Sequence, residues 1–430
     1  MMSLWYYEKI SNAKRLGAFM PSCRTKKGGK TVEYQLTEPA RTLKVSAVRE
    51  LLKLTQTDAV ISFAGGLPAE DFFPAEALKQ AFERVFTTGN KALQYGLTEG
   101  YTPLREQIGH RLARRDIHVA PDEILLTTGS QQAIDLVAKV YLEPGSVILT
   151  ENPTYLVALQ AFRYYSVQIV PVLSDEQGMD PEDLRAKIEQ YHPKLVYVIP
   201  TFANPTGWIW ETSRRMNLIE ECDRHNVLIV EDDPYGEIKF TPDEHYPSLM
   251  SLAQQSGKDC VVYTSTFSKT VVPALRIGWI CGARALVTAM VRAKQGADLH
   301  SSSLDQQALF QLLDQYDLDA HIGTIADEYQ RRMRLMITLL EQQNLEGAHW
   351  TEPKGGMFLW LELAQDLDAE VVLKQSLQEG VAFVPGTEFY VGSPQKNTLR
   401  LNFSHTGREK MTAGVERLGR AIHECVSSVR

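Results

Sequence analysis

The amino-acid sequence predicts an α/β protein with a parallel sheet covered by helices on both faces. From about residue 59 to residue 266, short apolar runs alternate with longer amphipathic stretches, a pattern typical of strand–helix–strand units. Several of the runs are apolar throughout, as expected of parallel strands buried on both sides. The chain has 430 residues, more than one hydrophobic core usually holds, so we expect a large domain and a smaller one.

The elements of the large domain follow one another along the chain. We expect strands at 124–127, 147–150, 167–170, 195–199, 227–230 and 261–263, and helices at 131–141, 155–164, 181–191 and 212–225. Most of these helices are followed closely by Gly, Pro or Asn, which end helices.

After residue 321 the pattern changes to that of a smaller α+β unit. It predicts a helix to about residue 340, a strand at 357–361, a helix near 369–379, a strand at 398–401 and a terminal helix. Because chain termini often lie close together, we expect an N-terminal segment, residues 1–64, to pack with this small domain, 321–430. Residues 65–320 then form the large domain.

Composition and charge narrow the classes of function. Apolar residues make up 44% and charged residues 23% of the chain, and the formal net charge is -8, so no basic field suggests nucleic acid as the main partner. The five cysteines are scattered without metal-ligand spacing, and we expect no metal site. No run approaches a membrane span and no signal peptide is visible, so we expect a cytoplasmic protein that acts on a small metabolite.

One lysine, Lys269, lies among hydroxyl side chains just after an expected strand, and Arg276 follows seven residues later. A desolvated lysine can be neutral near pH 7, can form an imine with an aldehyde cofactor and can later move a proton. Hydroxyl groups such as that of Ser268, together with an arginine, suit a phosphate. The alternative is an exposed lysine in a loop rich in Ser and Thr.

Three further positions lie where expected strands end. Ser130, in the run 128–133, opens a helix after a strand and so suits an anion, although an ordinary helix cap would read the same way. Asn204 and Asp232 follow two other strands, and ligands of open α/β sheets bind at such ends. A buried carboxylate needs a cation, and a protonated pyridine nitrogen would serve, while Asn204 and Tyr235 could bind a phenolic oxygen. The alternatives are a turn at 204–207 and, for Asp232, a helix cap or a salt bridge.

Two more side chains suit a planar cofactor and an acidic substrate. Tyr155, at the start of an expected helix, could stack on a ring or simply pack in the core. Arg400 lies in an apolar strand, where it is costly unless it pairs with an internal carboxylate or with a substrate carboxylate, whose shape its fork matches.

Taken together, these motifs resemble those of the fold type I pyridoxal-phosphate (PLP) aminotransferases, from about residue 61 to residue 403. The motifs are Gly129-Ser130-Gln131-Gln132, Asn204-Pro205-Thr206-Gly207, Glu231-Asp232-Asp233-Pro234-Tyr235, Ser268-Lys269 with Arg276, and the Arg400 strand. The resemblance implies an aspartate aminotransferase-like fold, with a mostly parallel seven-stranded sheet in the large domain. It also implies that Lys269 carries PLP and that Gln131 helps to bind it.

Within that family, residues 62–68 and 72–74 look like the 2-aminoadipate/kynurenine aminotransferase branch. This implies that Gly65 lies by the substrate carboxylate and that Tyr95 reaches the phosphate of a neighbouring subunit, in a homodimer with shared active sites. Many relatives have serine at the position of Thr266, which keeps the hydroxyl. The branch includes parts of certain bacterial regulators, but only about 40 residues precede the enzyme-like part, too few for a winged DNA-binding domain.

The resulting hypothesis is a transaminase that moves an amino group from an L-amino acid to a 2-oxo acid such as 2-oxoglutarate. Donors of the 2-aminoadipate, aromatic and branched-chain types fit the branch, and the sequence leaves the choice open. A same-fold lyase, cyclase or decarboxylase would keep the same cofactor residues. A ligand-sensing module without turnover and a purely structural protein are the remaining alternatives.

Overall fold

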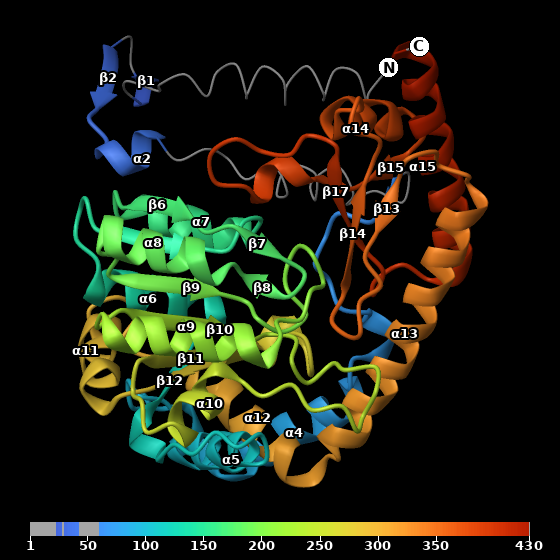
Figure 1. The fold of residues 1–430 in the computed structure, drawn as a ribbon. Helices are drawn as coiled ribbons and strands as arrows, with labels where there is room; N and C mark the ends of the chain where they lie inside the picture. Colours follow the sequence, from blue (N-terminus) through green and yellow to red (C-terminus); the bar gives the residue numbers. More distant parts are fainter. Residues whose placement is uncertain (1–22, 28–29, 43–59, 430) are drawn as a thin grey trace.

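A seven-stranded sheet forms the centre of the larger part of the protein (Figure 1). The computed structural model describes residues 23–27, 30–42 and 60–429. The strand order is β4-β12-β11-β10-β9-β5-β6, and only β12 runs antiparallel to its neighbours. The strands are β4 (Ile124–Thr127), β5 (Val147–Thr150), β6 (Gln168–Pro171), β9 (Leu195–Val198), β10 (Leu228–Asp232), β11 (Val261–Thr266) and β12 (Gly278–Cys281). The predicted α/β fold with a mostly parallel seven-stranded sheet is confirmed.

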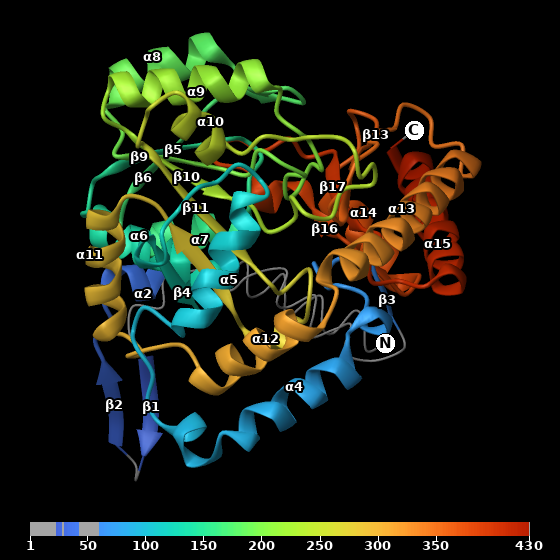
Figure 2. The same cartoon turned by 90° about the horizontal axis from the view of Figure 1, so that it is seen from below.

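Helices cover both faces of this sheet because successive strand residues point to opposite sides. In β9, Val196 and Val198 join the core on one face, whereas Leu195 and Tyr197 join the core on the other. Figure 2 shows α8 and α9 on the first side and α6, α7 and α11 on the second. The first face packs on α5 (Thr102–Ala113), α8 (Pro181–Tyr191), α9 (Thr212–Arg224) and α10 (Leu249–Gln255), and the second on α6 (Ser130–Tyr141), α7 (Leu156–Tyr164) and α11 (Arg284–Gln295).

Local sequence signals account for these helices. At α8, Asp180 accepts hydrogen bonds from the backbone nitrogens of Glu182 and Asp183 at 3.0 and 2.8 Å, and Pro181 occupies the first turn, as expected of a capped start. Helices α4 (Ala75–Thr87) and α12 (Ser303–Gln315) pack against each other. The short elements are β7 (Ser174–Asp175), β8 (Gly178–Met179) and 3₁₀ turns at Glu70–Phe72, Gly89–Leu93, Pro121–Glu123, Pro273–Leu275 and Gly386–Phe389.

A second, antiparallel sheet belongs to the C-terminal part of the chain. Its order is β13-β14-β17-β16, and helices α13, α14 and α15 pack on it (Figure 1). These elements are α13 (Leu318–Gln342), β13 (His349–Trp350), β14 (Phe358–Glu362), α14 (Ala369–Gln378), β16 (Val384–Pro385), β17 (Thr398–Asn402) and α15 (Arg408–Val429). This arrangement places Arg400 in a strand that is buried along its whole length.

Two parts of the N-terminal region lie in different places. β3 (Ile61–Ser62) pairs in parallel with β15 (Val381–Ala382) beside the small sheet. The hairpin β1 (Cys23–Lys27) and β2 (Lys30–Tyr34) leads to α2 (Glu38–Thr42), which lies beside α7. Residues 1–22, 28–29 and 43–59 of the predicted 1–64 segment lie outside the described residues, and the domain limits at 64 and 320 stay predictions.

Candidate active site

The strand ends of the large sheet bring the predicted site residues to one edge. Asp232 is the last residue of β10, Asn204 follows the neighbouring β9, and Lys269 follows β11 on the other side. Ser130 opens α6 directly after β4. Because parallel strands end at the same edge of a sheet, the carboxyl ends of β9, β10, β11 and β4 supply this group.

The Lys269 side chain is partly buried, and its amine donates a hydrogen bond to the carbonyl oxygen of Gly66 at 2.8 Å. Burial, reinforced by the positive charges of Arg276 and Arg400, lowers the lysine pKa to about 8. A lysine with such a pKa is deprotonated far more often at neutral pH than an exposed one. It can therefore act as a nucleophile and as a proton acceptor.

Asp232 is fully buried, and within the described part of the chain one of its two oxygens has a partner. Oδ2 accepts a hydrogen bond from the Tyr197 hydroxyl at 2.7 Å, whereas Oδ1 has no partner among the described residues. Burial raises the Asp232 pKa to about 7, although the bond from Tyr197 acts in the opposite direction. An unsatisfied buried carboxylate oxygen is the partner that a protonated ring nitrogen requires, so this position fits PLP.

Arg400 is a buried cation without an ion-pair partner among the described residues. Nη1 donates to Asn204 Oδ1 and Nη2 donates to the carbonyl oxygen of Ala64, both at 2.7 Å, while Nε is buried and has no partner in the described ranges. Its guanidinium carbon lies 4.1 Å from the centre of the Phe358 ring. Burial lowers its pKa to about 10, and an approaching carboxylate would offset the cost of burying the charge. The internal salt bridge considered above is absent from this part of the structure.

Gly65 lies between the two backbone carbonyls that receive these cations. Ala64 accepts from Arg400, and Gly66 accepts from Lys269. The predicted substrate residue is buried. This short segment therefore receives the arginine fork and the lysine amine on carbonyl groups two residues apart.

Asn204 and Tyr235 meet beside Arg400. Asn204 Nδ2 and the Tyr235 hydroxyl lie 3.4 Å apart, both buried. Burial raises the Tyr235 pKa, so its hydroxyl stays protonated and can donate a hydrogen bond. Tyr155, the residue before α7, is partly buried and close enough to raise the pKa of both Tyr235 and Tyr197.

A candidate anion site, called the anion cup below, lies at the N-terminus of α6 and consists of the first backbone N–H groups of that helix, Gly129, Ser268 and Arg276. The Arg276 guanidinium lies against this turn, with Nη1 3.2 Å from Ser268 Oγ and Nη2 3.5 Å from the carbonyl oxygen of Thr128. A Cβ atom at Gly129, whose φ is +77°, would lie 2.6 Å from Arg276 Nη2. Only glycine therefore lets the guanidinium approach the first peptide groups of the helix, whose N–H groups have no acceptor within the helix.

Three predicted cofactor residues are placed less directly. The Thr266 hydroxyl lies 3.0 Å from the carbonyl oxygen of Ile277 and 2.9 Å from Ser268 Oγ, so it holds the loop around Lys269. Gln131 is exposed in the first turn of α6. Tyr95 is 79% exposed, outside the buried group around Lys269, and its ring meets His300 edge-on with 5.8 Å between centroids.

Sequence reasoning missed the residues that support the site. Tyr197 lies in an apolar strand and, from the sequence, looks like a core residue. The carboxylate of Asp233 receives Arg115 at 2.6 Å and the Tyr263 hydroxyl at 2.9 Å, which braces the chain just after Asp232. The sequence signal for Asp233 is a charged residue directly after an apolar strand. Its partners, Arg115 and Tyr263, come from distant segments.

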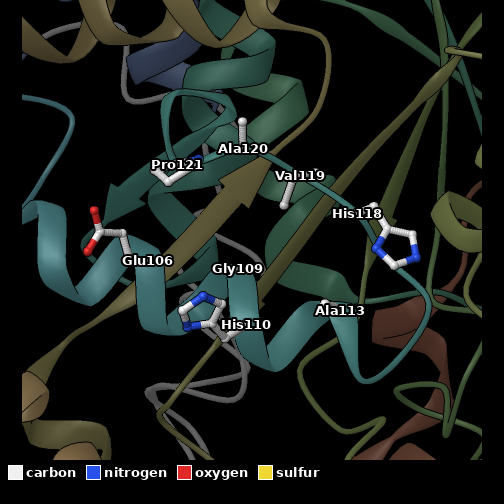
Figure 3. Close-up of a pocket in the computed structure, with 8 residues that line it drawn as sticks. All are labelled: Glu106, Gly109, His110, Ala113, His118, Val119, Ala120 and Pro121. Atoms are coloured by element: carbon white, nitrogen blue, oxygen red, sulfur yellow. The ribbon is translucent and has the colours of Figure 1, made fainter.

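Figure 3 shows a pocket away from this group of residues, between α5 and the loop that follows it. Its volume is ≈ 450 Å³, and none of its lining residues is a predicted site residue. A second cavity, of ≈ 380 Å³, has Tyr95 in its wall. The first pocket is lined by Glu106, Gly109, His110, Ala113, His118, Val119, Ala120 and Pro121.

Together, the lysine, the unsatisfied aspartate oxygen, the anion cup and the buried arginine on this sheet define a PLP-dependent enzyme of fold type I. Comparison with known families gives the same answer. The model of the aminotransferase class I and II family matches residues 58–418. The chain belongs to this family and is a PLP-dependent aminotransferase.

Two curated relatives are similar over most of their length. An aromatic-amino-acid aminotransferase from Thermococcus litoralis is 39% identical over 92% of this chain and 96% of its own. A 2-aminoadipate transaminase from Thermus thermophilus is 40% identical over 88% of this chain and 94% of its own.

A solved structure is also similar. An alpha-aminoadipate aminotransferase from Thermus thermophilus, complexed with N-(5'-phosphopyridoxyl)-L-leucine, has a TM-score of 0.85 and 37% identity, covering 91% of this chain and 98% of its own. In the described residues of the present chain, no helix is long and apolar enough to cross a membrane.

Proposed function

We propose that this aminotransferase takes the amino group from an L-amino acid of the 2-aminoadipate, aromatic or branched-chain type and gives it to a 2-oxo acid such as 2-oxoglutarate. The observation that carries the site assignment is the convergence of Lys269 and Arg400 on the two carbonyls that flank Gly65. It puts a proton-transferring amine and a carboxylate-binding fork next to each other. The donor classes rest on the names of the relatives.

The residues around Lys269 would hold the cofactor. Bound PLP supplies an electron sink for the charge that develops at the substrate Cα. Asp232 would keep the ring nitrogen protonated, because a nearby cation lowers the pKa of a buried carboxyl group and favours its charged form. Further contacts are assigned to the ring oxygen (Asn204, Tyr235), the ring face (Tyr155) and the phosphate (Ser130, Gln131, Thr266, Ser268, Arg276).

Lys269 has two tasks in this proposal. Its amine would hold the cofactor and, when free, would take up and return the proton at the substrate Cα. A pKa of about 8 suits a base that works near neutral pH. Arg400 binds the substrate carboxylate in two places, which orients the molecule so that the Cα–H bond is the one broken.

A homodimer would complete the site. We assign Tyr95 to the phosphate of the partner subunit, because it is exposed in the single chain together with Leu93 and Leu97, whose exposed fractions are 61% and 59%. Large apolar side chains clustered in this way usually mark an interface. We also propose that residues 65–320 form the large domain and that residues 321–430, with the N-terminal segment, form the small one. The proposed location is the cytoplasm.

The test begins with Lys269→Ala, which should abolish the visible absorbance band of lysine-bound PLP as well as amino transfer. Lys187→Ala is the control. It removes a lysine of α8 that is not a predicted site residue, and it should retain both the absorbance band and amino transfer. A mutant at position 269 that keeps the band would refute the assignment. With the wild-type enzyme, loss of the band against a panel of amino acids identifies the donor, and formation of glutamate from 2-oxoglutarate separates transfer from decarboxylation or elimination.

A further inference from the structure

Lys294, in α11, is a lysine whose side chain is completely buried. Its ammonium group contacts Asp298 at 2.8 and 2.9 Å, Gln132 Oε1 at 2.7 Å and Ser301 Oγ at 3.1 Å. An ammonium group has three protons to donate, and these three side chains account for all of them. Lys294 is therefore fully engaged and has one fixed orientation.

The contact of Lys294 with Gln132 leads to the anion cup. Gln132 Oε1 also accepts a hydrogen bond from the backbone nitrogen of Thr128 at 2.8 Å, and Gln132 Nε2 donates to Asp298 at 2.7 Å. The amide of Gln132 is thus held at both ends. It closes the turn between β4 and α6, so that the backbone nitrogen of Thr128 points at Gln132 and the first N–H groups of α6 are left for an anion.

A second path runs from the same ammonium group through Ser301. The hydroxyls of Ser301 and Thr128 lie 2.9 Å apart, and the Thr128 carbonyl oxygen faces Arg276 Nη2 at 3.5 Å. Through Gln132 and Ser301, Lys294 therefore holds the backbone nitrogen and the hydroxyl of Thr128. It does not contact the anion cup directly.

The segment after α11 extends this network toward Tyr95. His300 Nε2 accepts a hydrogen bond from the backbone nitrogen of Gly96 at 3.2 Å, and the His300 ring meets Tyr95 edge-on. The neighbouring Ser301 is bound by Lys294. One buried cation thus ties the turn at the start of α6 to the segment that presents Tyr95.

Burying this ammonium group is costly. Burial lowers the Lys294 pKa, although the nearby Asp298 carboxylate acts in the opposite direction. An apolar side chain of similar length would fill the same space without that desolvation cost. Unlike an apolar side chain, the ammonium group fixes the orientation of the Gln132 amide and of the Ser301 hydroxyl.

We infer that Lys294 is a positioning residue for the phosphate group of PLP: it holds Gln132 and Thr128 so that the N-terminus of α6 and Arg276 keep the geometry that a phosphate requires. The inference rests on the proposed phosphate site. It assigns no direct contact between Lys294 and the cofactor.

The experiment compares two aldehydes that differ only in the phosphate. Cofactor-free wild type and Lys294→Met are titrated with PLP and with pyridoxal, and binding is followed by absorbance. The variant should bind PLP roughly ten- to a hundredfold more weakly, as expected when hydrogen bonds around a charged group are lost. Its affinity for pyridoxal, which has no phosphate to place, should change by less than about twofold, because the Lys269 amine is untouched.

Lys187→Met is the matched control. Lys187 also pairs with an aspartate four residues away, Asp183 at 2.6 Å, but it lies in α8. This variant should bind both aldehydes like the wild type.

Three results would overturn the inference. They are wild-type PLP affinity in a folded Lys294→Met protein, an equal loss of PLP and pyridoxal, and a similar loss in the control. If Lys294→Met does not fold, Gln132→Leu breaks the link from the other end and keeps the Lys294–Asp298 pair, and it should show the same selective loss. Unchanged PLP affinity in that variant also refutes the inference. Failure of the proposed cofactor site would appear earlier, as a wild type without Lys269-dependent binding.

Discussion

The Tyr197 hydroxyl donates to Asp232 Oδ2 at 2.7 Å from the neighbouring strand. In the register of β9 and β10, Tyr197 lies opposite Val230, and Asp232, two residues further on, points to the same face. The tyrosine therefore reaches the carboxylate diagonally and fixes its orientation. The other oxygen, Oδ1, is left buried and without a partner in the described part of the chain, in the position where a ring nitrogen is proposed to bind.

This arrangement predicts a pH dependence of the stability of the cofactor-free protein. The Asp232 pKa rises from 3.8 to about 7, mainly through burial. A carboxyl group with a raised folded-state pKa stabilises the fold below its unfolded pKa, and this contribution is lost as the pH rises through the folded pKa. The melting temperature of the wild type minus that of Asp232→Asn should therefore fall between about pH 4 and pH 7. Calorimetry across this range tests it, and a constant difference would contradict the raised pKa.

Arg400 should control the binding of substrates but not of the cofactor. In Arg400→Met, the fork that bonds Asn204 and Ala64 is gone, and a substrate carboxylate would lose its buried partner. We expect kcat/KM to fall by roughly a hundred- to a thousandfold for the amino donor and for 2-oxoglutarate. Steady-state kinetics measures this, and Arg400→Lys should recover only part of the loss because it keeps the charge without the fork. Unchanged kinetics, or loss of the PLP absorbance band, would argue against a carboxylate site.

The strands of the large sheet were predictable because buried parallel strands are short apolar runs between helices. All six predicted strands are present to within a few residues. The seventh strand, β12, was not predicted. It is a four-residue antiparallel strand directly after the Arg276 loop. Its pairing with β4 joins segments more than a hundred residues apart, and periodicity carries no such information.

The candidate site likewise contains residues that the sequence could predict and residues that it could not. Asn204, Asp232 and Lys269 could be predicted because polar residues directly after apolar strands are unusual and the sheet gathers strand ends. The carbonyl of Gly66 and the hydroxyl of Tyr197 could not, since a backbone atom has no signature and a tyrosine in an apolar strand looks like core. The close approach of Gly278 to Gly129, where a Cβ atom would lie 2.7 Å from the Gly129 carbonyl carbon, exists only once β12 has paired with β4.

Gly129→Ala should weaken phosphate binding through Arg276. The added methyl group would lie 2.6 Å from Arg276 Nη2, so the guanidinium must move away from the cup. Gly257→Ala is the matched control, because that glycine also has a positive φ, +67°, but nothing within 4 Å of the added atom. Both variants should lose about 1 kcal/mol or more of stability from the unfavourable φ. Only Gly129→Ala should raise the dissociation constant for PLP, and equal affinities in equilibrium titrations would show that the clash does not reach the cup.

The proposed sharing of Tyr95 between subunits can be tested by mixing two inactive variants. Lys269→Ala lacks the amine but keeps Tyr95, whereas Tyr95→Ala lacks the tyrosine but keeps Lys269. If each site combines the lysine of one subunit with the tyrosine of its partner, a hybrid dimer contains one intact site. Random exchange of equal amounts then restores about a quarter of the wild-type activity, since half of the dimers are hybrids with one working site of two. A mixture kept below the temperature of subunit exchange is the control. If both residues serve the site of their own chain, no hybrid has an intact site and the mixture stays as inactive as its components.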